Sequence, residues 1–520
     1  LAVQGLCFRF FTAMLRAPEI SVEVCLLSGR SCLVAISPSD NVMLLLQRSR
    51  EKLDVDISRL YAGAKALPLG HRLVDLGIKN GAVLTGAVVN VQVISSLEAL
   101  WHGDAWPLTC CSEAQDGAFL AAQRDGKAVV WGGLACSDKF YQELTDLCDV
   151  KATVGAFAAL RPNGSVLCWG KAQFGGDKSE VKDQLQADVC ALYANSKSFA
   201  ALKHDGSVVT WGGARYANFG GDSSKVQEQL VGVQRICAAE TAFAALKADG
   251  SVVTWGDSCQ GGDSSRVTEQ LRGVVALHST RRAFAALKDT GEVVTWGTAT
   301  EGGGSFMVQD QLHSVVEVSA TTYAFSALRS DGSVISWGQT AMSPCTTGVL
   351  KVIGNDCAFA AVLGDGSVVT WSDSNGGKGG GDSLAAQREL RDIVEIHPFE
   401  QCFVAMRRDK SAIFWGRDQE PQVFRDVTKV GVTKRGLAAL KMDGSVEGID
   451  FPVRGGISFT SVESQLQEGV TELHMNANAF AAVKHDGSIL TWGSQKHGGD
   501  SRSVQGLLAE GVLEGKRLKR

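Results

Sequence analysis

Short runs of apolar and β-branched residues alternate with brief polar turns along most of the chain. AFAALK (242–247) and SVVTWG (251–256) are two such runs, separated by Ala-Asp-Gly. This pattern predicts a β-hairpin, because glycine adopts the positive φ that the turn requires and aspartate tolerates the turn. Alternation places apolar side chains on both faces of the hairpin. Such a hairpin must lie between similar neighbours, as in a stack or ring of small sheets.

The hairpin recurs about ten times. Each copy ends on a tryptophan, with a phenylalanine twelve residues earlier, and successive copies lie 34 to 44 residues apart. One copy carries Leu437 and Ile449 in place of the aromatic pair. A repeated unit of this length indicates a repeat architecture whose units stack on one another. We predict that the tryptophans form the structural core of the repeats: Trp131, Trp169, Trp211, Trp255, Trp296, Trp337, Trp371, Trp415 and Trp492.

Two further stretches complete each unit. An apolar stretch precedes the hairpin, such as VGVQRICAAE (231–240), and predicts an additional strand. A stretch such as FGGDSSKVQEQL (219–230) follows the tryptophan. Its glycines permit a tight reversal, and its aspartate and serine favour capping of a short helical turn. The predicted unit is therefore a sheet of three to four strands and a connection to the next sheet.

The motif FAALKxDGSVVTWG resembles the repeat of RCC1-like (regulator of chromosome condensation-like) proteins. The resemblance covers residues 109–515 and implies a β-propeller. Closed propellers usually have four to eight blades. Ten units therefore leave open a wide ring, a seven-bladed ring with an extra set, and an open superhelix. The predicted fold class is an all-β propeller-like repeat array.

Residues 20–90 lack the repeat. They predict the order strand, strand, helix, strand, strand, which resembles the small α+β ubiquitin-like (β-grasp) domain. The resemblance implies a docking patch at Leu27, Leu60 and Ala87. In the alternative interpretation, Leu27 and Leu60 pack against the connector that follows the domain. No diglycine follows the last strand, so conjugation to a target is not predicted.

The remaining segments are short. We predict a disordered leader over residues 1–19, a connector over 91–108 and a basic tail over 516–520. The net charge of -5 gives no basic field for nucleic acid, and no apolar run is long enough for a membrane span. The fourteen cysteines are scattered without a CxxC pair, which is typical of reduced thiols inside the cell. The expected location is the cytoplasm or the nucleus.

No pattern of catalytic or ligand residues emerges. His204 and His485 occupy the same turn position of two repeats, where an exposed turn explains them better than chemistry. The Gly-Gly-Asp stretches lack the context of a phosphate or calcium loop. RCC1-like propellers occur in HERC-type ubiquitin ligases, but this sequence has no room for their C-terminal catalytic domain. We therefore predict no catalytic residues, no cofactor and no metal.

The predicted function is a non-enzymatic protein-interaction scaffold. A protein partner would bind the propeller face formed by variable loops such as 212–221 and 373–382. The ubiquitin-like domain would link the propeller to ubiquitin receptors or the proteasome. The alternatives are a guanine-nucleotide exchange factor for a small GTPase and the non-catalytic part of a HERC-type ligase.

Overall fold

The protein is described from a computed structural model of all 520 residues. The structure describes residues 149–504 except 162, 214–218, 340–346, 373–377, 417–418 and 452–455. Before residue 149 it describes strand segments and a few positions between 37 and 80. The predicted leader and tail lie outside the described residues. No helix in the described part has the length and apolar character needed to cross a bilayer.

The repeat region forms ten small antiparallel sheets, here called units one to ten. Nine units have three strands and unit eight has a fourth. The units, in order, are β6–β8 (Val91–Ser95, Ala118–Gln123, Ala128–Gly132), β9–β11 (Asp149–Ala152, Ala156–Leu160, Val166–Gly170), β12–β14 (Val189–Ala194, Ser198–Lys203, Val208–Gly212), β15–β17 (Val233–Ala238, Ala242–Lys247, Val252–Gly256), β18–β20 (Val274–Ser279, Ala283–Lys288, Val293–Gly297), β21–β23 (Val315–Ala320, Ala324–Arg329, Val334–Gly338), β24–β26 (Val349–Gly354, Ala358–Leu363, Val368–Ser372), β27–β30 (Ile393–Phe399, Cys402–Arg407, Ala412–Gly416, Gln419–Phe424), β31–β33 (Val427–Val432, Gly436–Lys441, Val446–Asp450) and β34–β36 (Val470–Met475, Ala479–Lys484, Ile489–Gly493).

Short 3₁₀ turns follow most of the sheets. They are η2 (Ala172–Phe174), η3 (Ser179–Leu185), η4 (Ser224–Gln229), η5 (Ser258–Gln260), η6 (Thr268–Gln270), η7 (Ala299–Glu301), η8 (Gln309–Gln311), η9 (Lys378–Gly380), η10 (Leu384–Ala386), η11 (Phe459–Ser461), η12 (Glu463–Gln465), η13 (Gln495–His497) and η14 (Arg502–Val504). They correspond to the predicted helical connections.

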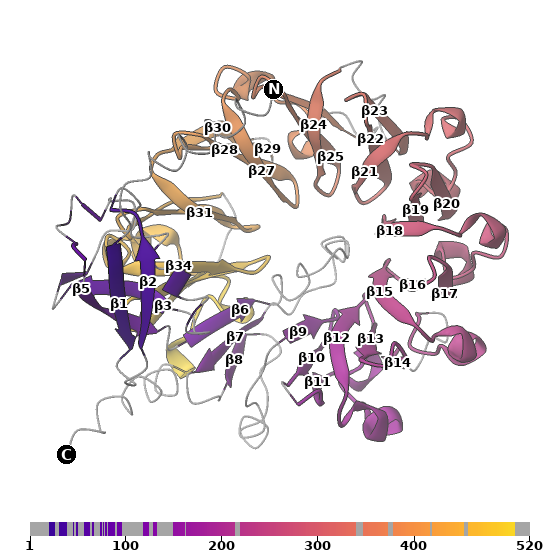
Figure 1. The fold of residues 1–520 in the computed structure, drawn as a ribbon, viewed down its shortest axis with the longest axis horizontal. Coiled ribbons are helices and arrows are strands. Elements are labelled where there is room, and N and C mark those ends of the chain that lie inside the picture. Colours follow the sequence, from indigo (N-terminus) through magenta and orange to yellow (C-terminus); the bar gives the residue numbers. More distant parts are fainter. Residues whose placement is uncertain are drawn as a thin grey trace, which may run out of the picture.

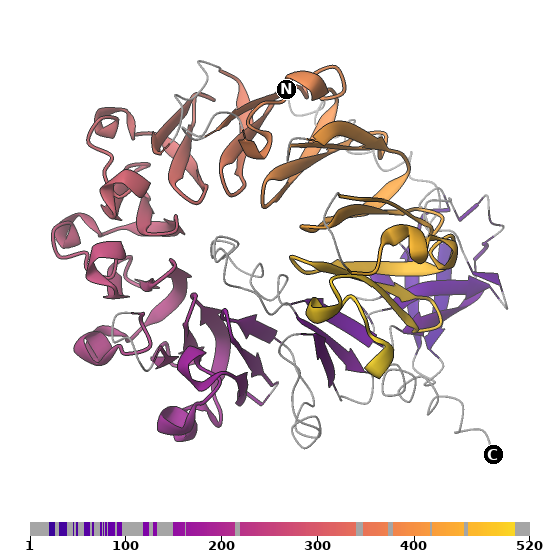
Figure 2. The same ribbon diagram turned by 180° about the vertical axis from the view of Figure 1, so that it is seen from behind.

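The ten sheets are arranged as a ring (Figure 1). The first strand of most units lies nearest the middle of the ring and the 3₁₀ turns lie at its periphery, as the view from behind also shows (Figure 2). First strands of neighbouring units contact one another from unit two to unit eight and between units nine and ten, and β34 of unit ten contacts β6 of unit one. The prediction of about ten stacked sheets is therefore confirmed, and among the open alternatives the structure adopts the wide ring.

Neighbouring sheets bury their apolar faces against each other. Between units four and five, Ala244 and Leu246 from one sheet form a buried cluster with Phe284 and Trp296 from the next. Equivalent clusters join each successive pair from unit two to unit ten. Both faces of the hairpins in units three to nine are thus removed from water, which is the largest favourable contribution to the fold.

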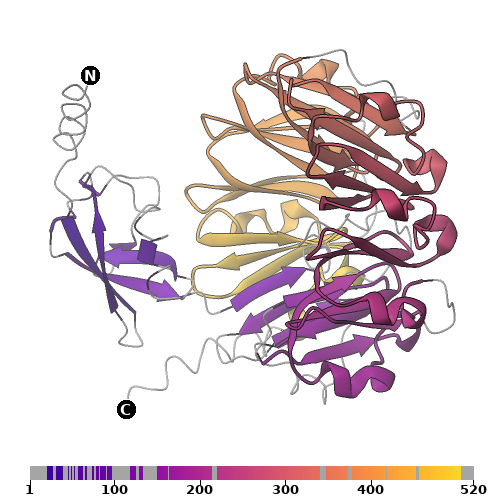
Figure 3. The same ribbon diagram turned by 45° about the vertical axis from the view of Figure 1, so that its right-hand side comes forward.

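A five-stranded sheet precedes the ring and stands apart from it (Figure 3). Its order is β2-β1-β5-β3-β4, with β1 and β5 parallel and the other pairs antiparallel. The strands are β1 (Ile20–Leu26), β2 (Ser31–Ile36), β3 (Ile57–Ala62), β4 (Lys65–Ala66) and β5 (Ala82–Val88).

Helical residues, including the buried Leu45, lie between β2 and β3. The structure has the four predicted strands and a helical segment in the predicted order for residues 20–90, and it adds the two-residue strand β4 between β3 and β5. Val22, Val34 and Leu84 share a buried cluster with Leu45. Strand β6, Val91–Ser95, falls inside the range predicted as a connector and forms part of unit one. The rest of that range lies outside the described residues.

Candidate interaction surface

In the units whose side chains are described and that carry it, the aromatic motif is buried between sheets. Trp255 stacks on Phe243 with ring centroids 5.2 Å apart, and its indole nitrogen donates to the carbonyl of Gly220 at 3.0 Å. The same indole bond to a glycine carbonyl recurs in four other units: Trp211 with Gly175, Trp296 with Gly261, Trp337 with Gly302 and Trp415 with Gly380. The other described tryptophan side chains, Trp169, Trp371 and Trp492, are also buried. The side chain of Trp131 lies outside the described residues; its backbone pairs with Phe119.

The glycines after each tryptophan have a second role that the sequence did not indicate. Gly220 adopts φ +83, and a β-carbon there would lie 2.7 Å from the ring of Phe243 in the next unit. A side chain at this position would therefore displace the buried aromatic pair as well as strain the backbone. The Gly-Gly-Asp stretch is a packing element between units, in keeping with the turn interpretation.

The aspartates of this stretch and of the hairpin turns bind nearby backbone groups. Asp222 accepts a bond from the backbone N–H of Ser224 at 2.9 Å, and that bond lowers its pKa. In the hairpin turn, Asp249 accepts from the hydroxyl of Ser251 at 2.6 Å and from its N–H at 2.9 Å. The hydroxyl bond first, and then the backbone bond, lower the pKa of Asp249. These carboxylates stabilise turns.

A β-bulge interrupts the first strand in units three to ten. In units nine and ten the bulged residue is a threonine whose hydroxyl donates to a carbonyl of the second strand, as in the 3.0 Å bond from Thr428 to Leu440. In units five to eight the bulged residue is aliphatic, and its side chain is between 53% and 65% exposed. We call these four residues the inner row: Val275, Val316, Leu350 and Val394.

The inner row has the character of a contact surface. A bulge leaves one residue outside the ladder and redirects its side chain. A polar side chain at that position can form a hydrogen bond to the backbone, whereas the side chains of valine and leucine have no hydrogen-bonding group. Exposed aliphatic side chains at the same strand position in four successive units indicate a patch that contacts another molecule.

Charged residues of alternating sign border the inner row. The residue after the bulge is acidic in units six, eight and ten and basic in units seven and nine: Glu317, Lys351, Glu395, Lys429 and Glu472. Partial burial raises the pKa of Glu317, and the charge of Lys351 opposes that shift. A nucleic acid would require a continuous basic track. The alternation instead favours a protein surface that presents both signs.

A separate charge network joins units four and five. Arg281 binds Glu240 through two parallel bonds of 2.7 and 2.9 Å, and this pairing raises the pKa of Arg281. Arg282 lies 3.5 Å from both Glu240 and Glu301. Burial raises the pKa of Glu301, whose side chain is 8% exposed. The backbone N–H of Arg281 also donates to Thr322 in unit six. The network therefore ties neighbouring units together at the turns between first and second strands.

The predicted ubiquitin-like docking patch is only partly described. Leu60 in β3 pairs with Gly86, and Ala87 in β5 pairs with Arg59, so the two residues lie on adjacent strands. Their side chains and all of Leu27 lie outside the described residues. The variable loops 212–221 and 373–382, predicted as the contact face, are described except for residues 214–218 and 373–377.

The residues weighed for chemistry have ordinary surroundings. His204 and His485 are exposed in hairpin turns. Burial raises the pKa of the Cys168 thiol to about 12. Within the described ranges, no group of three histidine, cysteine, aspartate or glutamate side chains could hold a metal ion.

No family model and no curated protein sequence matches this chain. Among solved structures, the CRINKLY WD40 ectodomain of the Arabidopsis thaliana receptor kinase ACR4 is 16% identical with a TM-score of 0.29, over 50% of this chain and 94% of that chain. The computationally designed Ika8 protein is 15% identical with a TM-score of 0.31, over 58% and 95%. Yeast RCC1 (Prp20) bound to Kap60 is 15% identical with a TM-score of 0.29, over 50% and 70%. Likenesses this weak leave the family and the partner undecided.

Proposed function

We propose that this protein is a non-enzymatic scaffold that binds a protein partner on the inner wall of its ring. The observation that carries the proposal is the inner row, four exposed aliphatic residues on successive units. The alternating charges beside it support a protein partner over a polyanion. A rigid ring of packed sheets suits this role, because binding then costs little ordering of the surface.

The partner is expected to present an apolar segment flanked by both acidic and basic side chains. Aliphatic side chains would cover the inner row, and the flanking charges would pair with residues such as Lys351 and Glu395. Such rim pairs contribute more to the rate and specificity of association than to affinity.

The proposal is tested with Leu350→Asp in the inner row and Leu384→Asp at the periphery. Leu350 lies in the first strand of unit seven and is 65% exposed, and Leu384 lies in the connection from unit seven to unit eight and is 80% exposed. The partner is captured with the full chain, purified, and titrated calorimetrically against each variant. We expect Leu350→Asp to weaken binding at least about tenfold, because a buried charge would face an apolar surface. Equal affinity for both variants would contradict the inner-wall site.

We also propose that the N-terminal sheet links the scaffold to ubiquitin receptors or the proteasome. The strand order β2-β1-β5-β3-β4 and the helical residues between β2 and β3 support a β-grasp domain. The test compares Leu60→Arg with Val83→Arg, an exposed position on β5, in the full chain. Only Leu60→Arg is expected to reduce binding to purified ubiquitin receptors. No binding by the unmodified chain would remove this link and leave the inner-wall site standing.

A further inference from the structure

The connection that follows unit five keeps the internal bonds of the regular connections. The Ser305 hydroxyl bonds to the Gln309 side chain at 2.6 Å, and Gln309 donates to the carbonyl of Val293 at 3.1 Å. Unit three has the same two bonds, at 2.8 and 3.0 Å. The connection of unit five is therefore fixed against its third strand in the same way, and any difference lies in the side chains that face solvent.

Two of these solvent-facing side chains are large and apolar. Phe306 is 79% exposed and Met307 is 80% exposed. In units three and four the same two positions hold a serine followed by a lysine or an arginine, at 224–225 and 265–266. Adjacent apolar side chains that are held in water indicate a contact site rather than a packing requirement of the ring. We call Phe306 and Met307 the knob.

A groove of about 1270 Å³ opens between units two and three. One wall is the connection that follows β11, and the other is β14 with the connection that follows it. Val181, Val209 and Trp211 supply apolar surface, and the exposed Gln173 and Gln184 also line the groove. The groove therefore offers an apolar lining bordered by neutral polar groups.

The two walls of this groove lack a bond that ties neighbouring connections together elsewhere. Between units four and five, the Thr298 hydroxyl donates to the carbonyl of Cys259 at 3.1 Å, across the two connections. The residue of unit three equivalent to Thr298 is Gly213, which has no side chain to form this bond. Gly213 and Gln173, the equivalent of Cys259, both line the groove. The sequence of unit three thus leaves out the bridge at the place where the groove lies.

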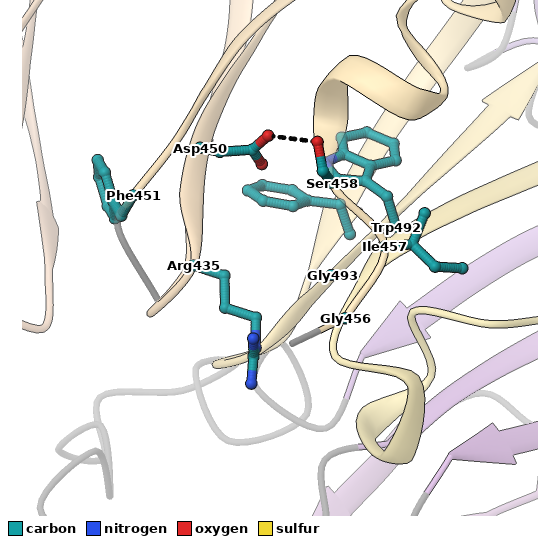
Figure 4. A pocket seen from close by; sticks show the side chains of 9 residues that line it. Arg435, Asp450, Phe451, Gly456, Ile457, Ser458, Trp492 and Gly493 are labelled. Carbon is teal, nitrogen blue, oxygen red and sulfur yellow. Dashed lines mark hydrogen bonds between the residues drawn. The ribbon is translucent and has the colours of Figure 1, made fainter. Parts of the chain in front are cut away.

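The cavity between units nine and ten is smaller (Figure 4). Its volume is about 170 Å³, and Asp450 at its wall accepts bonds from the Ser458 hydroxyl at 2.8 Å and the Phe459 N–H at 3.0 Å. A cavity of about 150 Å³ holds one benzene ring. The cavity is therefore too small for a phenylalanine and a methionine together, whereas the groove between units two and three has room for both.

We propose that the knob of one copy of this protein docks in the groove of a second copy. The knob belongs to unit five and the groove to units two and three, which are different parts of one ring (Figure 1). One ring cannot bring them together, so the contact forms between copies. Because the two surfaces differ, the contact is heterologous, and each added copy leaves a free knob at one end and a free groove at the other.

Charged residues at the two surfaces are compatible with this contact. Asp310 is exposed three residues after the knob, and the groove lining carries Lys171 together with Glu180. Opposite charges can therefore meet at the border of the apolar contact, where they favour specificity over affinity. The contact does not use the inner row, so its failure would leave the proposed scaffold function intact.

The test is sedimentation velocity of the full chain over a range of concentrations. We expect the sedimentation coefficient of the unmodified chain to increase with concentration. The double variant Phe306→Asp, Met307→Asp should weaken association at least about tenfold, because two carboxylates would enter an apolar groove. Leu384→Asp is the matched control, since Leu384 is 80% exposed at the position of unit seven equivalent to Phe306, and it should leave association unchanged.

Mixing two variants tests whether the knob occupies this groove. Gln184→Arg places a long charged side chain in the groove and should also weaken association at least about tenfold, while its knob stays intact. An equimolar mixture of the knob double variant and Gln184→Arg retains one working contact. It should form a complex of one copy of each variant and nothing larger.

Three results would overturn the proposal. The first is an unmodified chain that stays monomeric at every concentration. The second is a loss of association in Leu384→Asp equal to that of the knob double variant. The third is a mixture of the two variants that stays monomeric, since it would show that the knob does not bind the groove.

Discussion

Two interfaces of the ring, between units four and five and between units eight and nine, are filled by aromatic side chains from opposite sheets. In the first, Trp296 of the later unit packs against the earlier sheet, where Thr254 occupies the facing strand. In the second, the tryptophan is replaced by Ile449 and the threonine by Phe414. The large aromatic side chain therefore comes from the later unit in the first interface and from the earlier unit in the second.

Additional aromatic residues complete the second interface. Phe414 contacts Phe451 at 6.0 Å between ring centroids, and Phe424 of the extra strand β30 joins the same buried cluster. The difference teaches that the repeat requires a filled volume between sheets rather than a tryptophan at a fixed place. The motif is therefore a packing device, and its loss in one unit is tolerated where the neighbour supplies the volume.

The largest expected effect comes from removing a core aromatic in a regular unit. Trp296→Ala should destabilise the protein by about 3–5 kcal/mol, because it leaves a large cavity and an unpaired Gly261 carbonyl. Ile449→Ala, at the equivalent position of unit nine, should cost about 2 kcal/mol or less, because Ile449 is only partly buried. Urea unfolding of the two variants measures the difference, and equal losses would contradict the comparison.

Exchanging the aromatic between the two sides sharpens the comparison. Phe414→Thr alone should leave a void, and Ile449→Trp alone should overfill the interface. The double variant recreates the arrangement of Thr254 and Trp296, so the two changes should compensate by about 1–3 kcal/mol. Strict additivity in a double-mutant cycle would show that these positions do not share one volume.

A smaller effect is expected at the charge network between units four and five. Glu240→Gln removes the charge that pairs with Arg281 in a half-buried setting, and should cost about 1–2 kcal/mol. Glu269→Gln is the matched control, since its pair with Arg272 is exposed and should contribute almost nothing. The free energy of unfolding at neutral pH measures both, and equal values would argue against a stabilising network.

The smallest effect concerns pH. The hairpin aspartates have pKa values lowered by their serine hydroxyls, as for Asp249 and Ser251. Their stabilisation is present above the unfolded pKa of about 3.9 and is lost as pH falls through the lower folded pKa. Asp249→Asn should therefore reduce the loss of stability measured below about pH 4. If the unfolding midpoint of Asp249→Asn falls below about pH 4 as steeply as that of the unmodified chain, this carboxylate does not contribute.

The sequence predicted what is set by local chemistry. The Ala-Asp-Gly turn, the β-branched strands and the two apolar faces each follow from a few adjacent residues, and the structure has the predicted sheets. The number of units came from the spacing of the tryptophans, but closure of the ring did not. Closure depends on the angle between successive sheets, to which many side chains in each interface contribute.

Features that depend on residues far apart in the chain were not predicted. The contact of Gly220 with Phe243 involves the next unit, and the bulge that exposes Leu350 arises from a register shift against the second strand. The inner row could have been noticed as an aliphatic residue at one strand position in four successive units. The role of Phe414 in filling the interface with unit nine could not have been noticed in the sequence, because neighbouring residues do not show that its side chain faces the next sheet.

The most direct test of the packing account is hydrogen exchange of the tryptophan indole groups, followed by NMR on the full chain. We predict slow exchange for the indoles bonded to glycine carbonyls, including Trp255 and Trp296, because they are buried between stacked sheets. Rapid exchange of Trp255 and Trp296, at the rate of an indole exposed to solvent, would contradict the claim that the repeated motif packs one sheet against the next.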